Sequence, residues 1–315
     1  MKRVIFLIGG VLALALASAG GWYVAQRTAM PPAVLGPSPA AAESVTFLAV
    51  GRQGYGNDHG RRVAAGMERA AAEQPTHFVV FGGDNFFRNG VESVDDPQWQ
   101  TKFEDQYDGP HLRGLPMFAV LGNHDHDGNP QAQVSYAAQR KGTGRWRMDG
   151  LYYSRDFGRT DDGAVLLRVV FLDMIPMMDS PAEQEQFLRD ALTAPGSPRW
   201  KAVVGHNPLR SLTEQPTALT RVMHDLLPVA QQLDVDLAVS SNDWFQQLLD
   251  VPGEPMHVST SGGGRKLEEV PFRNEPGTYT KSQHGFARIT IDAHSLTVEM
   301  LDADGEATYT ASRGK

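Results

Sequence analysis

The sequence predicts an α/β layer fold in which buried strands alternate with helices. Short, continuous apolar runs recur along the chain with helix-like segments between them, and strands of this kind are covered on both faces. The last part of the chain instead alternates apolar and polar residues, as an antiparallel meander does. The expected strands are residues 45–50, 77–81, 117–121, 165–172, 202–204 and 236–239. The expected helices are residues 61–72, 182–192 and 218–233, and the meander covers 285–310.

The first residues form a segment distinct from this body. Lys2 and Arg3 precede an apolar run that continues to about residue 25 and contains a small-x-small pattern at 17–19. Residues 1–29 are therefore predicted to be either a cleaved signal peptide or an uncleaved membrane anchor. Either alternative implies export to a periplasm-like or extracellular compartment, because the positive end stays inside. Residues 30–44 are rich in proline and alanine and form a linker, so that residues 45–315 form a single domain.

Composition excludes some functions. The net charge is −8 and the sequence pI is about 5.7, so the chain has no basic field for nucleic acid. The chain has no cysteine, which excludes disulfides and thiolate metal ligands.

Polar side chains follow the expected strands. Asp84 and Asn85 follow the second strand, and residues 123–126, Asn-His-Asp-His, follow the third. His206 and Asn242 follow two later strands. Any one of these groups alone is more often a turn or a helix cap. Together they predict a ligand site at one sheet edge, since ligands of open α/β sheets bind beyond the carboxyl ends of the strands. Oxygen and imidazole donors suit a divalent or trivalent metal.

The motifs GGDNFF, GNHDH, VVGHNP and HGFARITID resemble those of the calcineurin-like metallophosphoesterases, in the branch of the purple, or tartrate-resistant, acid phosphatases. The resemblance runs from about residue 45 to the C-terminus. It implies a four-layer α/β/β/α sandwich with two metal ions at the strand ends.

The resemblance also implies which residues hold the metals. Asp84 corresponds to the bridging aspartate, and Asn123 and His206 to ligands of the second metal. Asn242 stands where that metal has a histidine, and its side-chain carbonyl oxygen would be a weaker ligand than an imidazole. The ligand positions of the first metal carry Arg52, Phe87 and Trp244 in place of aspartate, tyrosine and histidine.

These replacements remove coordination. Arginine has donors only, phenylalanine has no oxygen, and the indole nitrogen of tryptophan is a donor. The resemblance implies that a hydroxide held between two metals attacks the phosphorus of the substrate. Losing one metal should therefore remove most of the acceleration of phosphoester hydrolysis. His124 and Asp125 are retained; the resemblance places them over the substrate and behind it, and they are vestigial if the protein is inactive. A substrate-side histidine is replaced by Gln215.

Three functions remain open. The first is a pseudophosphatase that binds a phosphate, a phosphoester or a protein partner. The second is an active phosphomonoesterase with one metal (zinc, manganese or iron) or with substitute ligands from Asp58, His59 or Asp243. The third is a structural domain held at the membrane by residues 1–29. We expect no metal or one divalent ion, not a two-metal centre.

Arg52 is predicted to pair with Asp84 and to replace the lost metal electrostatically, since an unpaired buried carboxylate is costly. Trp244 is expected to fill the space that the metal and its imidazole would occupy.

Overall fold

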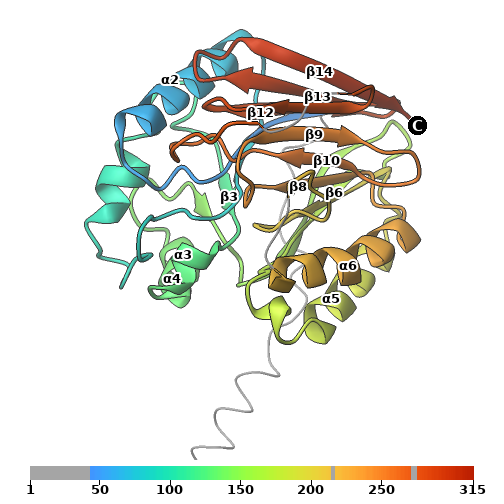
Figure 1. Cartoon of the computed structure of the whole chain (residues 1–315), viewed down its shortest axis with the longest axis horizontal. Coiled ribbons are helices and arrows are strands. Elements are labelled where there is room, and N and C mark those ends of the chain that lie inside the picture. Colours follow the sequence, from blue (N-terminus) through green and yellow to red (C-terminus); the bar gives the residue numbers. More distant parts are fainter. Residues whose placement is uncertain (1–42, 214–216, 271–274) are drawn as a thin grey trace, which may run out of the picture. The chain divides into compact units, whose positions relative to one another are not determined.

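The computed structural model describes residues 43–213, 217–270 and 275–315, and the predicted signal or anchor and most of the predicted linker lie outside these ranges. Two seven-stranded sheets carry helices on their outer faces, so the α/β prediction is confirmed (Figure 1). Within the described ranges, no helix combines the length and the apolar character needed to cross a membrane.

The first sheet joins the N-terminal strands to the C-terminal meander, in the order β14-β13-β12-β1-β2-β3-β4. β1, β2, β3 and β4 are parallel, while β12 runs antiparallel to β1 and continues through two hairpins, as the alternating pattern predicts. Its strands are β1 (Ser44–Val50), β2 (Phe78–Phe81), β3 (Met117–Ala119), β4 (Trp146–Arg147), β12 (Gly285–Asp292), β13 (Ser295–Asp302) and β14 (Ala307–Gly314).

The second sheet has the order β11-β9-β10-β8-β7-β6-β5, with β10, β8, β7 and β6 parallel. Its strands are β5 (Tyr153–Arg159), β6 (Val165–Phe171), β7 (Trp200–Val204), β8 (Leu237–Ser240), β9 (Gln246–Asp250), β10 (Met256–Ser259) and β11 (Thr278–Lys281).

The helices lie outside the two sheets (Figure 1). α2 contacts β12 of the first sheet, and α5 contacts β6 of the second and packs against α6. Asn57 caps α2 by accepting a hydrogen bond from the backbone N–H of Gly60, at 2.9 Å. The helical segments are α2 (Asp58–Glu73), η1 (Gln100–Glu104), α3 (Asn123–His126), α4 (Pro130–Ala138), η2 (Pro176–Met178), α5 (Ala182–Thr193) and α6 (Thr217–Gln232).

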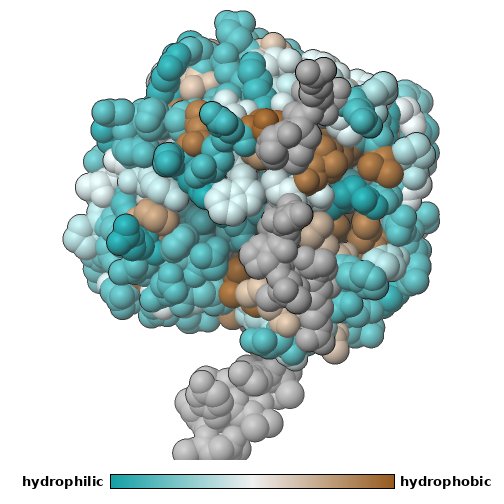
Figure 2. Space-filling view, viewed as in Figure 1, coloured by the Kyte–Doolittle hydropathy of each residue, from teal (hydrophilic) through white to brown (hydrophobic). Residues whose placement is uncertain are grey.

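The continuous apolar strands are explained by two core clusters. Every residue of β6 is buried. Val169 and Phe171 belong to the large cluster, which also includes residues of the first sheet, whereas Val170 belongs to the cluster formed with α5 and α6. A strand with a core on each face cannot alternate apolar and polar residues. The outer surface drawn in Figure 2 is mainly hydrophilic, with hydrophobic side chains in a few separate groups.

Candidate functional site

The predicted site residues meet where strands of both sheets end. Arg52 follows β1, Asp84 follows β2, and Asn123 begins α3 shortly after β3. His206 and Asn242 follow β7 and β8 of the second sheet. The parallel strands deliver these groups to one region, as the sheet-edge argument predicts.

The backbone aims Arg52 and Asp84 toward each other. Both residues have a φ of 55°, in the left-handed region that costs non-glycine residues about 1 kcal/mol or more. The two loops are tied together: the N–H of Arg52 donates to the carbonyl of Gly83 at 3.1 Å, and that of Gly54 to the carbonyl of Asp84 at 3.2 Å. The loops after β1 and β2 therefore each contain one residue in the left-handed region, and they are hydrogen-bonded to each other. This arrangement brings the side chains of Arg52 and Asp84 close together.

Arg52, which the resemblance places at a ligand position of the first metal, lies close to Asp84. Its side chain is 12% exposed, and its Nε lies 3.7 Å from Oδ2 of Asp84. The predicted pair is therefore present as an ion pair, at a distance too long for a hydrogen bond. The terminal nitrogens donate instead to Oδ1 of Asn242 and to the carbonyl of Asp243, the latter at 3.1 Å. Burial lowers the pKa of Arg52, while the Asp84 charge raises it.

His206 presents an unpartnered nitrogen to Asp84. Its Nδ1 donates to the carbonyl of Gly82 at 2.8 Å, which leaves Nε2 as the unprotonated nitrogen of a neutral ring. Burial lowers the pKa of His206, which favours that neutral form. Nε2 has no hydrogen-bond partner and lies 3.4 Å from Oδ1 of Asp84. The lone pair of Nε2 and the negative carboxylate oxygen repel each other, and a cation bound between them would remove this repulsion.

The donor set does not fit a two-metal centre. Arg52 is a cation at the first position, and Oδ1 of Asn242 already accepts a hydrogen bond from Arg52. Asp84, His206 and Asn123 are the residues that could hold one ion. Among the described residues, no group of three or more His, Cys, Asp or Glu side chains is placed to hold a metal ion.

Asp125 organises the loop behind Asp84. Its buried carboxylate accepts hydrogen bonds from the N–H groups of Gly122 at 2.8 Å and Asn85 at 3.1 Å, and from Gln133 at 2.9 Å. Burial and the nearby Asp84 charge raise the pKa of Asp125 to about 6. These contacts give Asp125 a positioning role, because its oxygens are turned to the backbone.

The mouth of the site is aromatic. Phe87 stacks on Tyr55 with ring centroids 3.9 Å apart, and it meets His124 edge-on at 4.5 Å. Trp244 is 43% exposed, and the guanidinium of Arg265 lies 4.5 Å from its ring centroid. The expectation that Trp244 fills the metal space is wrong: its ring lies at the surface, where a cation–π contact holds it.

The substitute ligands do not reach the site. Asp58 is exposed and paired with Arg61 on the first turn of α2, and His59 stacks on His284 with centroids 4.2 Å apart. The carboxylate of Asp243 accepts hydrogen bonds from Ser211 at 2.7 Å, from Thr213 at 2.9 Å and from Gln247. Gln215 lies outside the described residues.

Sequence reasoning missed Tyr55 and Arg265. Tyr55 lies in the loop after β1, and Arg265 follows β10 through a run of three glycines. Burial raises the pKa of Tyr55, and the nearby charges of Arg52 and Arg265 lower it in part. The rule that residues after parallel strands converge would have found Arg265, had β10 been recognised as a strand of the sheet.

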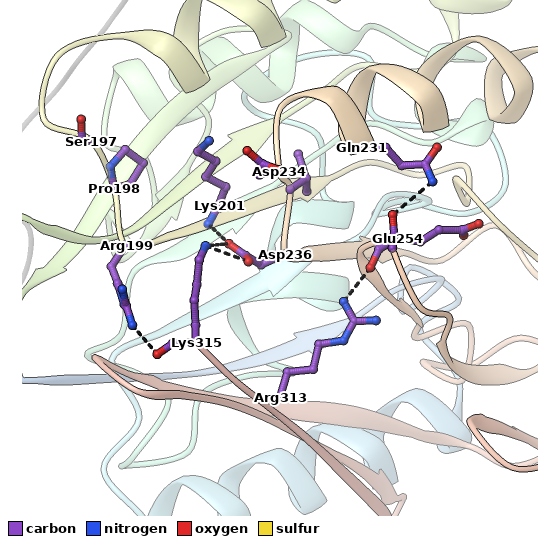
Figure 3. Close-up of a pocket in the computed structure, with 12 residues that line it drawn as sticks. Ser197, Pro198, Arg199, Lys201, Gln231, Asp234, Asp236, Glu254, Arg313 and Lys315 are labelled. Atoms are coloured by element: carbon purple, nitrogen blue, oxygen red, sulfur yellow. Dashed lines mark hydrogen bonds and ion pairs between the residues drawn. The ribbon is translucent and has the colours of Figure 1, made fainter.

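A cavity of about 630 Å³ lies at the other edge of the second sheet, where β7 and β8 begin (Figure 3). Several of its charged groups are engaged with each other and with the backbone. Nζ of Lys315 lies 2.8 Å from Oδ2 of Asp236, and Nη1 of Arg313 donates to the carbonyl of Glu254 at 2.6 Å. The cavity thus lies where the strands of the second sheet begin, whereas the site of Arg52, Asp84 and His206, here called the strand-end site, lies where strands end. Many of the charges in the cavity are paired with opposite charges.

Comparisons with known proteins agree with the motifs. Residues 57–241 match the family described as calcineurin-like phosphoesterase. The chain is 30% identical over 297 residues to purple acid phosphatase 4 of Arabidopsis thaliana, covering 86% of this chain and 84% of that protein. It is 26% identical over 317 residues to human tartrate-resistant acid phosphatase type 5, covering 91% and 94%. A solved structure described as GAP50, the anchor in the inner membrane complex of Plasmodium, matches with a TM-score of 0.76 and 21% identity, covering 86% and 89%.

Proposed function

Because this chain belongs to the calcineurin-like phosphoesterase family, in its purple acid phosphatase branch, we propose that it is an exported pseudophosphatase that binds a ligand or a protein partner without hydrolysing it. The position of Arg52 is the observation that carries this proposal. A guanidinium 3.7 Å from Asp84 supplies positive charge where the dinuclear mechanism needs a metal, but it cannot activate a water molecule as a bound metal does.

Three further features support loss of hydrolysis. Phe87 has no donor oxygen, Trp244 turns its ring to the surface, and Oδ1 of Asn242 is engaged by Arg52. Together with Arg52, Phe87 and Trp244 leave Asp84 as the only residue of the expected first-metal set that could bind an ion, and the engagement of Asn242 weakens the site of the second metal.

A second function, a one-metal phosphomonoesterase, is favoured by a specific observation. Nε2 of His206 lies 3.4 Å from Oδ1 of Asp84 and has no hydrogen-bond partner. A single zinc, manganese or iron ion held there by Asp84 and His206, with Asn123 nearby, would supply Lewis acidity.

The third function is a structural anchor. The neighbour described as the anchor in a membrane complex has the same fold, and residues 1–29 of this chain have the composition of a signal or a membrane segment. In this function the folded domain binds a protein partner at the membrane. As in the pseudophosphatase, no hydrolysis takes place.

Elemental analysis combined with hydrolysis of p-nitrophenyl phosphate tests the proposal. The protein is assayed as purified and after addition of zinc, manganese or iron, with a purple acid phosphatase as a positive control. We expect at most one tightly bound ion per chain and no turnover. Two bound ions with metal-dependent turnover would establish the enzyme and overturn the proposal.

A further inference from the structure

We propose that the exposed side chains of Leu212 and Trp244, with Arg265 beside them, form a docking surface for an acidic and apolar segment of a protein partner. The inference rests on the proposed function, because it names the surface and the kind of partner that the chain would bind. Binding at this surface requires neither a metal ion nor a phosphate ligand.

Leu212 and Trp244 stand out by their exposure. They are 41% and 43% exposed, and within the described ranges they are the only large hydrophobic side chains that are exposed. A single exposed apolar residue is common on a protein surface and needs no explanation. Here, however, both exposed residues lie on loops that are joined to one buried group.

The carboxylate of Asp243 joins the two loops. The hydroxyls of Ser211 and Thr213, on either side of Leu212, donate to its oxygens at 2.7 and 2.9 Å. The backbone N–H of Trp244 donates to the same carboxylate at 2.8 Å. Asp243 is 2% exposed, so a buried polar network holds together two loops whose apolar side chains face the solvent.

Gln247 of β9 holds the same loops in place. Its Nε2 donates to the hydroxyl of Ser211 at 3.1 Å and to the carboxylate of Asp243. Its Oε1 accepts a hydrogen bond from the backbone N–H of Leu212 at 3.1 Å. Residues that are already held in one conformation lose little entropy on binding, and tryptophan is enriched among the residues that dominate interface energies. This arrangement therefore suits Trp244 to anchor a partner.

Arg265 determines the charge of the partner. Its guanidinium lies 4.5 Å from the ring centroid of Trp244, and the neighbouring Lys266 is exposed. Within the described part of the chain, Arg265 forms no ion pair, either with Glu268 and Glu269 of its own segment or with another acid. The chain as a whole carries a net charge of −8, so this cation attracts an acidic segment that the rest of the molecule repels.

Two other occupants fit this surface less well. A bilayer is bound through a long apolar face, as in an amphipathic helix, and two side chains supply little of that area. A second copy of the chain packed about a two-fold axis would present the same surface, so that cation would face cation. The charge and the small apolar area together favour an acidic, apolar segment of a different protein.

Selection of a displayed library of random short peptides against the full-length, EDTA-treated protein tests this assignment. We expect enrichment of peptides that combine Asp and Glu with aromatic or aliphatic residues. The double variant Leu212→Ser/Trp244→Ser should enrich no such peptides. The consensus peptide is then synthesised, and its affinity is measured by fluorescence polarisation, with urea unfolding of every variant as the check that it is folded.

Trp244→Ala should weaken binding of the consensus peptide by about thirtyfold, as expected for a central anchor. Leu212→Ser provides an independent test if Trp244→Ala lowers stability. Arg265→Gln should weaken binding by about fivefold and reduce its salt dependence. Arg159→Gln is the matched control, because Arg159 is exposed on β5 and pairs with Val165 where β6 begins, at the other end of the sheet. Its affinity should stay within about twofold of the parent.

The inference is overturned if no peptide is enriched, if the enriched peptides are basic or uncharged, or if they bind the double variant as well as the parent. Binding to phosphatidylglycerol vesicles that the double variant loses would assign the surface to a membrane instead. Self-association in sedimentation that the double variant loses would assign it to a second copy. Either result overturns the inference.

Hydrolysis of p-nitrophenyl phosphate, measured separately, decides the proposed function. Turnover with intact peptide binding would refute the pseudophosphatase alone. Absence of peptide binding in a protein without turnover would refute this docking surface alone.

Discussion

Replacing Arg52 by alanine tests whether an arginine substitutes for a metal in holding this site together. The substitution removes the cation 3.7 Å from Asp84 and the hydrogen bonds to Asn242 and Asp243. Asp84 is 2% exposed, so its carboxylate would remain buried with no cationic partner at that oxygen.

The magnitude follows from that distance. Two unit charges 3.7 Å apart at an effective dielectric constant of about 20 interact by roughly 4.5 kcal/mol. The N–H of His124, which donates to Oδ1 of Asp84 at 3.2 Å, remains and stabilises the carboxylate in part. We expect the free energy of unfolding to fall by about 3–5 kcal/mol, the range for breaking a buried pair. In a domain of this size, that corresponds to a drop in Tm of roughly 10 °C.

Urea unfolding of EDTA-treated protein measures this change, with Arg88→Ala as the exposed control. The double variant Arg52→Ala/Asp84→Asn should recover much of the lost stability, because the uncompensated charge is then absent. Added zinc or manganese should partly restore Arg52→Ala through binding to the folded state. An alanine variant as stable as the parent, or a double variant no better than the single one, would refute the electrostatic replacement.

Four further outcomes are expected. Iron-loaded protein should show no tyrosinate-to-iron absorption band, because Phe87 has no phenolate; a visible band of that kind would show that another tyrosine takes the position. Elemental analysis should give at most one tightly bound ion per chain, and a measured value of two would reveal ligands beyond Asp84, Asn123 and His206. A variant that regains the family's ligands should bind metal more tightly, as measured by calorimetry; it carries Arg52→Asp, Phe87→Tyr, Asn242→His and Trp244→His. Unchanged binding would contradict the assigned ligand positions. Burial lowers the pKa of His257 to about 4, below its unfolded value of 6.5, so its contribution to stability is present above pH 6.5 and is lost as the pH falls toward 4. This shift in pKa corresponds to about 3 kcal/mol of unfolding free energy. His257→Gln should remove a pH dependence of about this size between pH 6.5 and 4, and an unchanged dependence would argue against a buried neutral ring.

The layers of the fold could be predicted because they depend on local chemistry. The continuous apolar run of β6 requires a core on each face, and the two core clusters supply it. The alternating C-terminal run requires a solvated face, and it forms β12, β13 and β14. The strands β4, β5, β9, β10 and β11 were missed, because each is a short or mixed polar and apolar run without a clear strand pattern.

By itself, the sequence determined which atoms are available to this site. Arg52 and Phe87 cannot ligate a metal in any conformation, whereas Asp84 and His206 can, and this depends only on side-chain chemistry. It also determined that these groups follow strands and therefore meet.

Only the tertiary structure decided what those atoms contact. A long arginine has many rotamers, and Arg52 is directed by acceptors about 190 residues away in sequence, on Asn242 and Asp243. The same loop turns the Trp244 ring to the surface, where Arg265 from beyond β10 covers it. Contacts of this kind depend on loops packed together by both sheets, and a local pattern in the sequence carries no information about that packing.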